Sequence, residues 1–222
     1  MGDPRGARQL IAEVQAALEA LYALEGADPA EAYVVDREVA RRLGGAGQAD
    51  EELLVAEDAE GLSVALFLCP RLLARVEASA RAGRPAFDDA ALDDWCQLTE
   101  GISHFLYLSH VADQQRTATL LELEVQAEVD KFALCLLAGG SGDTEARARQ
   151  LLSRLFDGVR LRPHLRPAER HRYQEANRLA RRYCEGLLPL VRRRHRDRLV
   201  GELRYAYRLG ASAKLRHLAQ RH

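Results

Sequence analysis

Lysine is nearly missing from this chain of 222 residues. Lys131 and Lys214 are two of its 32 basic residues, and the other 30 are arginines. This bias, together with the many Ala, Leu and Gly residues, is the one that a GC-rich genome imposes. Arginine abundance alone therefore does not indicate nucleic-acid binding, whereas the position of the arginines can.

The chain also has few cysteines, and they are far apart. Cys69, Cys96, Cys135 and Cys184 form no Cys-x-x-Cys pair and no Cys/His ligand spacing, which argues against a zinc finger. Each lies in or beside an apolar stretch, where a reduced thiol packs as a small hydrophobic group. We therefore expect a cytoplasmic protein, and the first six residues predict neither a signal peptide nor a myristoylation site.

Long apolar runs and the common catalytic motifs are missing too. The apolar runs, such as residues 64–69, are far too short to span a bilayer, so no membrane partner is expected. The sequence has no Gly-rich phosphate loop, no Gly-x-Ser-x-Gly and no His-Glu-x-x-His. With 47% hydrophobic and 29% charged residues, the composition is typical of a soluble globular protein with an ample core.

Charge is instead strongly divided by position. Residues 160–222 contain 18 Arg/Lys and 5 acidic residues, an excess of 13 positive charges. Residues 1–159 contain 14 Arg/Lys and 28 acidic residues, an excess of 14 negative charges. Such a polarity either attracts an external anion or draws the basic segment back onto the acidic one.

Hydrophobic periodicity predicts an N-terminal part with both helices and strands. A helix is expected over 6–24, and 32–43 is ambiguous between strand and helix. Residues 53–56 and 62–68 flank a turn-rich segment and predict a β-hairpin. In its second strand, Leu62, Val64, Leu66 and Leu68 alternate with Ser63, Ala65 and Phe67, which predicts one strongly apolar face. Pro70 suits the first turn of a helix that runs to about residue 82.

After Gly83-Arg84-Pro85 the pattern is helical throughout. We expect helices starting at Asp88, over 116–138 and 143–157, from Pro167, over 190–208 and after Gly210. Pro189 is expected to break or kink the long basic helix that Pro167 opens. The sequence therefore predicts a predominantly α-helical α+β fold, with an α+β part over 1–84 and a helical bundle over 85–222.

The helix around residue 125 is apolar on two opposite sides. Leu121, Val125 and Val129 lie on one side and Leu123 and Ala127 on the other, which predicts a central helix packed on both sides. The polar residues Glu122, Gln126 and Asp130 follow one flank, and Glu124, Glu128 and Lys131 follow the other. We expect the latter three to be at least partly buried and paired.

The preceding helix carries a histidine that lies one turn after a glutamate. Glu100, His104 and Tyr107 follow one another at helical spacing, opposite the face that carries Trp95. If the two helices form an antiparallel pair, Glu100, His104, Glu124 and Glu128 become candidate ligands of a divalent metal, and His104 and Glu128 candidate catalytic residues. A structural hydrogen-bond network, with no cofactor, explains the same residues and is the interpretation we favour.

The basic segment is dense enough to contact phosphates. Its candidate nucleic-acid-binding residues are Arg178, Arg181, Arg182, Arg192, Arg193 and Arg194. Tyr173, Tyr183, Tyr205 and Tyr207 are interleaved with them. Because Tyr173 and Tyr183 belong to an ordinary helical core stripe, we interpret these aromatics as packing residues. The alternative for the arginines is a solvated face partly neutralised by the acidic segment.

One short pattern resembles a catalytic motif. The sequence from Arg166 to His171 is an Arg-x4-His, similar to the motif of HEPN-type RNases, small helical domains that often dimerise so that paired Arg and His side chains cleave RNA. The resemblance covers six residues, and Pro167 stands where that family prefers a polar residue. It implies catalytic roles for Arg166 and His171, and a homo-oligomer would be compatible with it.

Two classes of function thus remain. The first hypothesis is a non-enzymatic binding or regulatory protein whose basic C-terminal helices engage an acidic partner, either nucleic acid or an acidic protein. The alternative is an enzyme, with an inter-helical Glu/His site that holds a metal, or an RNase that uses Arg166 and His171.

Overall fold

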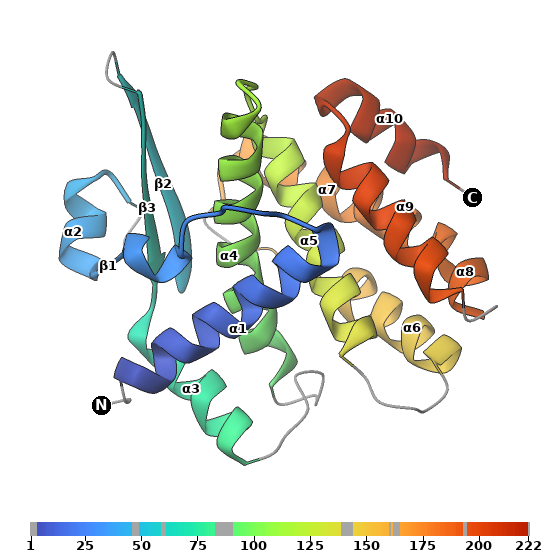
Figure 1. Cartoon of the computed structure of the whole chain (residues 1–222), viewed down its shortest axis with the longest axis horizontal. Coiled ribbons are helices and arrows are strands. Elements are labelled where there is room, and N and C mark those ends of the chain that lie inside the picture. Colours follow the sequence, from blue (N-terminus) through green and yellow to red (C-terminus); the bar gives the residue numbers. More distant parts are fainter. Residues whose placement is uncertain are drawn as a thin grey trace. The chain divides into compact units, whose positions relative to one another are not determined.

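The computed structural model describes residues 4–45, 49–58, 61–82, 91–138, 144–159, 161, 165–192 and 195–221. The described chain is mostly helical with one small sheet, which confirms the predicted fold class (Figure 1). It divides into two compact units: Met1–Leu18 with Glu25–His110, and Glu19–Leu24 with Val111–His222. The end of the first helix, including Tyr22, thus belongs to the C-terminal unit.

The sheet of the first unit has the strand order β1-β3-β2. Strands β2 (Glu51–Asp58) and β3 (Gly61–Leu68) form the predicted antiparallel hairpin, the long ribbon in Figure 1. The short β1 (Val34–Val35) runs parallel to β3 and pairs Val34 with Leu66. The ambiguous segment 32–43 contains both elements, because β1 is followed by α2 (Arg37–Arg42), which the Asp36 side chain caps at Val39 N.

Strand β3 departs from the expected alternation. Its first half is exposed, including Leu62, whereas Ala65, Leu66, Phe67 and Leu68 are all buried. One face is covered by α4 (Leu92–Asp113), where Gly101 is so close that a Cβ there would lie 3.1 Å from Leu68 Cδ2. The guanidinium of Arg37 stands 4.7 Å from the centre of the Phe67 ring. The second half of β3 is thus buried on both faces of the sheet, whereas the sequence predicts a strand with one apolar face.

The other helices of the first unit follow their expected signals. Helix α1 (Pro4–Tyr22) begins this unit, a single 3₁₀ turn covers Ala30–Tyr33, and α3 (Pro70–Arg81) starts at Pro70. The apolar stripe of α1 is buried as predicted; its members are Leu10, Val14, Leu18, Leu21 and Tyr22.

The second unit is built from helices alone among its described residues. They are α5 (Leu120–Leu137), α6 (Thr144–Leu152), a π-helical turn (Ser153–Asp157), α7 (Pro167–Gly186), α8 (Leu188–Arg192), α9 (Arg196–Arg208) and α10 (Ala211–Gln220). Helix α5 packs along α7, and α10 packs against α7, α9 and α5. Pro167 opens α7, as predicted. The helix is interrupted just before Pro189, and Gly210 separates α9 from α10, both as predicted.

The predicted division at residues 84 and 85 stays a prediction. Residues 83–85, on which it rests, lie outside the described part of the chain. The compact units separate near the C-terminal end of α4 instead, between His110 and Val111.

Candidate functional site

Helix α5 is buried around nearly its whole circumference, although it carries many polar side chains. Leu123 and Ala127 are buried on one side and Val125 and Val129 on the other, and the polar flanks between them are buried too. A Thr119–Glu122 capping box fixes its first turn, where Glu122 accepts from Thr119 N at 2.8 Å. This confirms that α5 is a central helix and places its carboxylates in the core.

The flank that carries Glu124, Glu128 and Lys131 is paired, as expected. Lys131 Nζ lies 2.9 Å from Glu128 Oε1, and the two side chains are 9% and 19% exposed. Arg172 of α7 reaches Glu124, with Nε 3.3 Å from Oε1. Arg172 therefore does not lie on the exposed face of α7. It neutralises the carboxylate of Glu124, which is only 8% exposed.

The opposite flank of α5 forms a buried network with two residues that the sequence did not single out. Lys214 of α10 donates to Gln126 Oε1, and Gln126 Nε2 donates to Asp130 Oδ1 at 2.7 Å and to Tyr22 Oη at 3.1 Å. The Tyr22 hydroxyl in turn donates to Asp130 Oδ1. We call Tyr22, Gln126, Asp130 and Lys214 the Lys214 network; each member is at most 2% exposed.

Burial controls protonation in this network. Removal from water lowers the pKa of Lys214 to about 7, against the attraction of the Asp130 and Glu122 carboxylates, and the Arg116 charge lowers it further. Burial also raises the pKa of Tyr22, and the neighbouring Asp130 carboxylate adds a smaller increase in the same direction. The Tyr22 ring stacks on Tyr207 at 4.0 Å, and Lys214 Nζ lies 5.3 Å from the centre of the Tyr207 ring.

The Lys214 network joins helices rather than presenting a reactive amine. Lys214 is 1% exposed, so its amine is sealed from solvent although its pKa is close to neutral. Through the network, α10 is connected to α5 and to the end of α1. Nearby, Arg204 Nε and Arg208 Nη2 each donate at 2.7 Å to the last carbonyls of α1, those of Leu21 and Tyr22. The network is therefore a structural element.

A sequence signal for Lys214 did exist. Both lysines of this arginine-rich chain are buried, Lys131 at 8% and Lys214 at 1% exposure. A guanidinium needs several acceptors in a plane, whereas an ammonium group fits a pocket with few partners and gives up its charge more readily. In this arginine-rich chain, the two positions that carry lysine instead of arginine are both buried.

The candidate metal ligands lie on two elements of different units. Glu100 and His104 belong to the part of α4 in the first unit, and Glu124 and Glu128 belong to α5 in the second. Glu124 and Glu128 have Arg172 and Lys131 as partners. The hypothesis of a shared site, with His104 and Glu128 as catalytic groups, stays a prediction.

Arg166 and His171, the residues of the HEPN-like motif, lie at the start of α7. Arg166 is its N-cap, and its guanidinium Nη2 is 2.6 Å from Glu169 Oε1. This contact and the Arg166 backbone N–H lower the pKa of Glu169 to about 2. His171 is exposed on the first turns of the helix. Their proposed catalytic roles stay a prediction.

Several candidate nucleic-acid-binding arginines have acidic partners at the surface. Arg178 contacts Glu175 at 2.6 Å, and Arg181 contacts Asp157 at 2.7 Å. Arg182 is half-buried on α7, and Arg193 and Arg194 lie outside the described residues. At 100° per residue, the arginines of α7 other than Arg172 fall on the half of the helix opposite its buried side chains.

The interleaved tyrosines divide into two kinds. Tyr183 and Tyr207 are fully buried, at 0% and 2% exposure, which confirms that they are packing residues. Tyr205 of α9 also packs, with its ring centroid 5.2 Å from that of His217 in an edge-on arrangement, but it is 56% exposed. Arg198, Gly201 and Tyr205 follow one another at helical spacing and are all exposed. An exposed aromatic ring thus shares a helix face with an exposed arginine.

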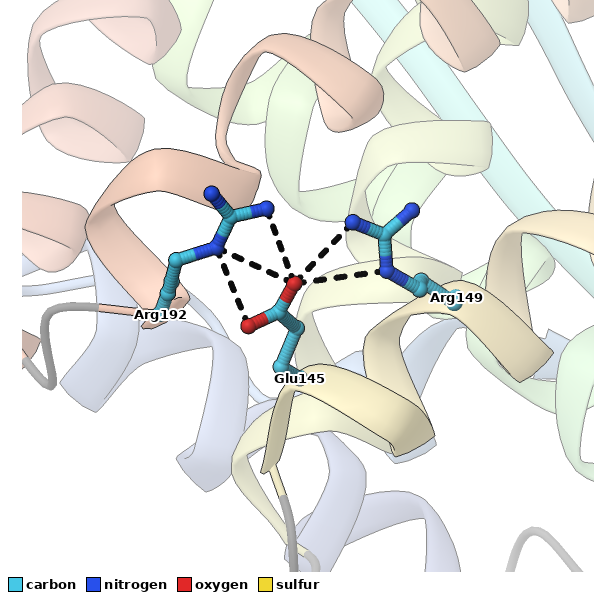
Figure 2. Close-up of polar contacts among 3 residues, drawn as sticks. All are labelled: Glu145, Arg149 and Arg192. Atoms are coloured by element: carbon cyan, nitrogen blue, oxygen red, sulfur yellow. Dashed lines mark hydrogen bonds and ion pairs between the residues drawn. The ribbon is translucent and has the colours of Figure 1, made fainter.

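Figure 2 shows the remaining candidate, Arg192, on a carboxylate that it shares with a second arginine. Arg192 Nη2 and Arg149 Nη2 each lie 3.0 Å from Glu145 Oε1. The hydrogen bonds from Arg192 and Arg149 lower the pKa of the Glu145 carboxyl. Arg192 thereby ties α8 to the first turn of α6.

Comparison with known protein families, with curated proteins and with solved structures finds no match to this chain. No described helix is both long enough and apolar enough to cross a membrane.

Proposed function

We propose that this chain binds single-stranded nucleic acid through its arginine-rich C-terminal helices, without cleaving it. The observation that carries the proposal is the excess of 13 positive charges over residues 160–222. Clustered arginines on helices attract a polyanion, and their neutralisation of phosphates releases condensed counterions.

The competing interpretation is a basic segment that folds back onto the acidic one. Within the second unit, Arg172, Arg181 and Arg192 each pair with a carboxylate from residues 1–159. Their carboxylate partners are Glu124, Asp157 and Glu145. The proposal takes the excess of 13 positive charges over residues 160–222 as the charge that an external polyanion would meet.

Several ion pairs of the basic segment are exposed and therefore weak enough to exchange. The side chains of Arg166, Arg178 and Arg192 are 81%, 54% and 60% exposed. Exposed pairs contribute little to stability, so a phosphate can replace the carboxylate at little cost. A bidentate guanidinium fits a phosphate as well as it fits a carboxylate.

Tyr205 favours nucleic acid over an acidic protein as the partner. Its ring is exposed on the same face of α9 as Arg198. Aromatic rings beside arginines are the platforms on which the bases of single strands stack, whereas an acidic peptide offers no base for such a contact.

The test is a binding titration of the full chain with a fluorescent single-stranded RNA, the matching single-stranded DNA and polyglutamate, each over a series of salt concentrations. We expect the logarithm of the affinity for RNA and DNA to fall linearly with the logarithm of salt concentration. Polyglutamate should bind more weakly at every salt concentration.

Three outcomes overturn the proposal. No retention of RNA or DNA at low salt would show that the basic segment is satisfied internally. Equal or tighter binding of polyglutamate would identify an acidic protein as the partner. RNA that is cut during the titration, and left intact by His171→Ala, would establish the RNase alternative; a denaturing gel of the bound RNA shows which holds.

A further inference from the structure

Glu145 is held by two guanidinium groups at once. Its Oε1 accepts from Arg192 Nε at 3.1 Å and Nη2 at 3.0 Å, and from Arg149 Nε at 3.3 Å and Nη2 at 3.0 Å. Its Oε2 lies 3.1 Å from Arg192 Nε. Two donor forks thus converge on one carboxylate (Figure 2).

The charges of this cluster do not balance. Two arginines carry two positive charges and Glu145 carries one negative charge, because these same contacts favour its ionised form. The hydrogen bonds to Glu145 likewise raise the pKa of Arg192. A phosphate group has several oxygens and can accept hydrogen bonds from both guanidinium groups at once. A carboxylate has only two oxygens to share between them.

The cluster is also open to solvent. The side chains of Arg149 and Arg192 are 56% and 60% exposed, and that of Glu145 is 28% exposed. Glu145 lies in the first turn of α6. In the sequence, Arg192 begins the run Arg192-Arg193-Arg194. Arg192 thus belongs to a strongly basic stretch of the sequence, and its exposed side chain is accessible to a phosphate in solution.

We propose that Arg149 and Arg192 form a phosphate-binding clamp for nucleic acid, and that Glu145 occupies this clamp as an internal competitor until a phosphate displaces it. This inference rests on the proposed function and adds a regulatory contact to it. The tethered carboxylate lowers the apparent affinity, because each binding event first breaks the Glu145 contacts.

The decisive variant is Glu145→Gln, compared with Asp197→Asn. Both changes remove one negative charge, and Asp197 is an exposed residue of α9 that makes no ion pair among the described residues. We expect Glu145→Gln to raise the affinity for single-stranded RNA roughly two- to fivefold more than Asp197→Asn does, the factor that corresponds to an exposed ion pair. Equal gains would show a bulk charge effect and overturn the clamp.

A second variant keeps the net charge constant. Glu145→Asp shortens the side chain by one methylene and withdraws the carboxylate from the guanidinium forks. We expect a smaller gain in RNA affinity than for Glu145→Gln, and we expect Arg149→Gln added to Glu145→Gln to abolish the gain. A loss of affinity in Glu145→Gln, or a gain that persists without Arg149, would contradict the proposal.

A probe without nucleic acid separates this inference from the proposed function. Inorganic phosphate added to folded Glu145→Gln should shift the NMR Nε–Hε resonances of Arg149 and Arg192, and the wild type should respond only at higher phosphate concentration. A phosphate response with no RNA binding would refute the proposed function and leave the clamp standing. RNA binding with no response from either arginine would refute the clamp alone.

Discussion

Lys214 of the last helix donates a hydrogen bond to Gln126 of the central helix, at a depth where neither residue is more than 2% exposed. Gln126 Nε2 in turn donates to Asp130, so the amide of Gln126 links the ammonium group to the carboxylate. This makes α10 part of the core of the second unit. Lys214, near the end of the chain, thus completes a polar network that is buried within the second unit.

Replacing Lys214 by Met should destabilise the protein by about 1–3 kcal/mol, because Gln126 Oε1 loses its donor and stays buried. Urea denaturation followed by circular dichroism measures the change. The Lys214→Met/Asp130→Asn double variant should cost less than the sum of the two single variants, since the uncompensated carboxylate is removed with its partner. Strict additivity would show that the two groups do not interact.

Stability should rise with pH between about 7 and 9 on account of Lys214. Burial lowers its folded-state pKa to about 7 from the ordinary lysine value of 10.5, so over this range the unfolded chain binds more protons than the folded one. Above about 9 the trend should reverse, because the pKa values of Cys184 and Tyr22 are raised by burial and their unfolded forms lose protons first. In Lys214→Met the rise should vanish, which pH-dependent urea titrations would detect.

Removal of Glu128 should be costly, because it leaves the Lys131 ammonium without this carboxylate in a buried setting. We expect Glu128→Ala to lower the free energy of unfolding by about 1–3 kcal/mol. The matched control is Glu38→Ala, whose partner Arg42 lies 4.0 Å away and whose own side chain is 83% exposed. The control should change stability by no more than about 0.5 kcal/mol; equal effects would show that Glu128 behaves as a surface residue.

Tyr205→Leu should weaken binding of single-stranded RNA without weakening binding of heparin. Base–aromatic stacking contributes about 1–3 kcal/mol per base, whereas heparin has charge but no bases. The ratio of the two affinities at one salt concentration is the measurement. An unchanged ratio would mean that the exposed ring plays no part, and that charge alone accounts for binding.

The metal hypothesis can be tested at His104. If His104 has a structural role, His104→Gln lowers the melting temperature while the metal content of the purified protein stays unchanged. Elemental analysis of wild type and variant makes the comparison. Stoichiometric zinc, iron or manganese that is lost in a folded His104→Gln protein would establish the enzyme alternative.

Local patterns in the sequence were sufficient for most elements of the fold. Pro70 and Pro167 open helices, Gly210 separates the last two, and the hairpin strands lie where the turn-rich segment places them, because these effects act within a few residues. The two apolar faces of α5 likewise predicted a central helix with Glu124 and Lys131 buried. Each of these inferences needed only helical or strand periodicity.

The partners of buried polar groups could be decided only by the tertiary structure. Tyr22 and Asp130 are 108 residues apart in the chain, and Gln126 and Lys214 are 88 apart, so no local pattern links them. The same limit hid the exposure of the Tyr205 ring and the contact of Arg192 with Glu145. Periodicity fixes which side of a helix a residue occupies, whereas the chain segment that faces that side is set by how the helices pack together.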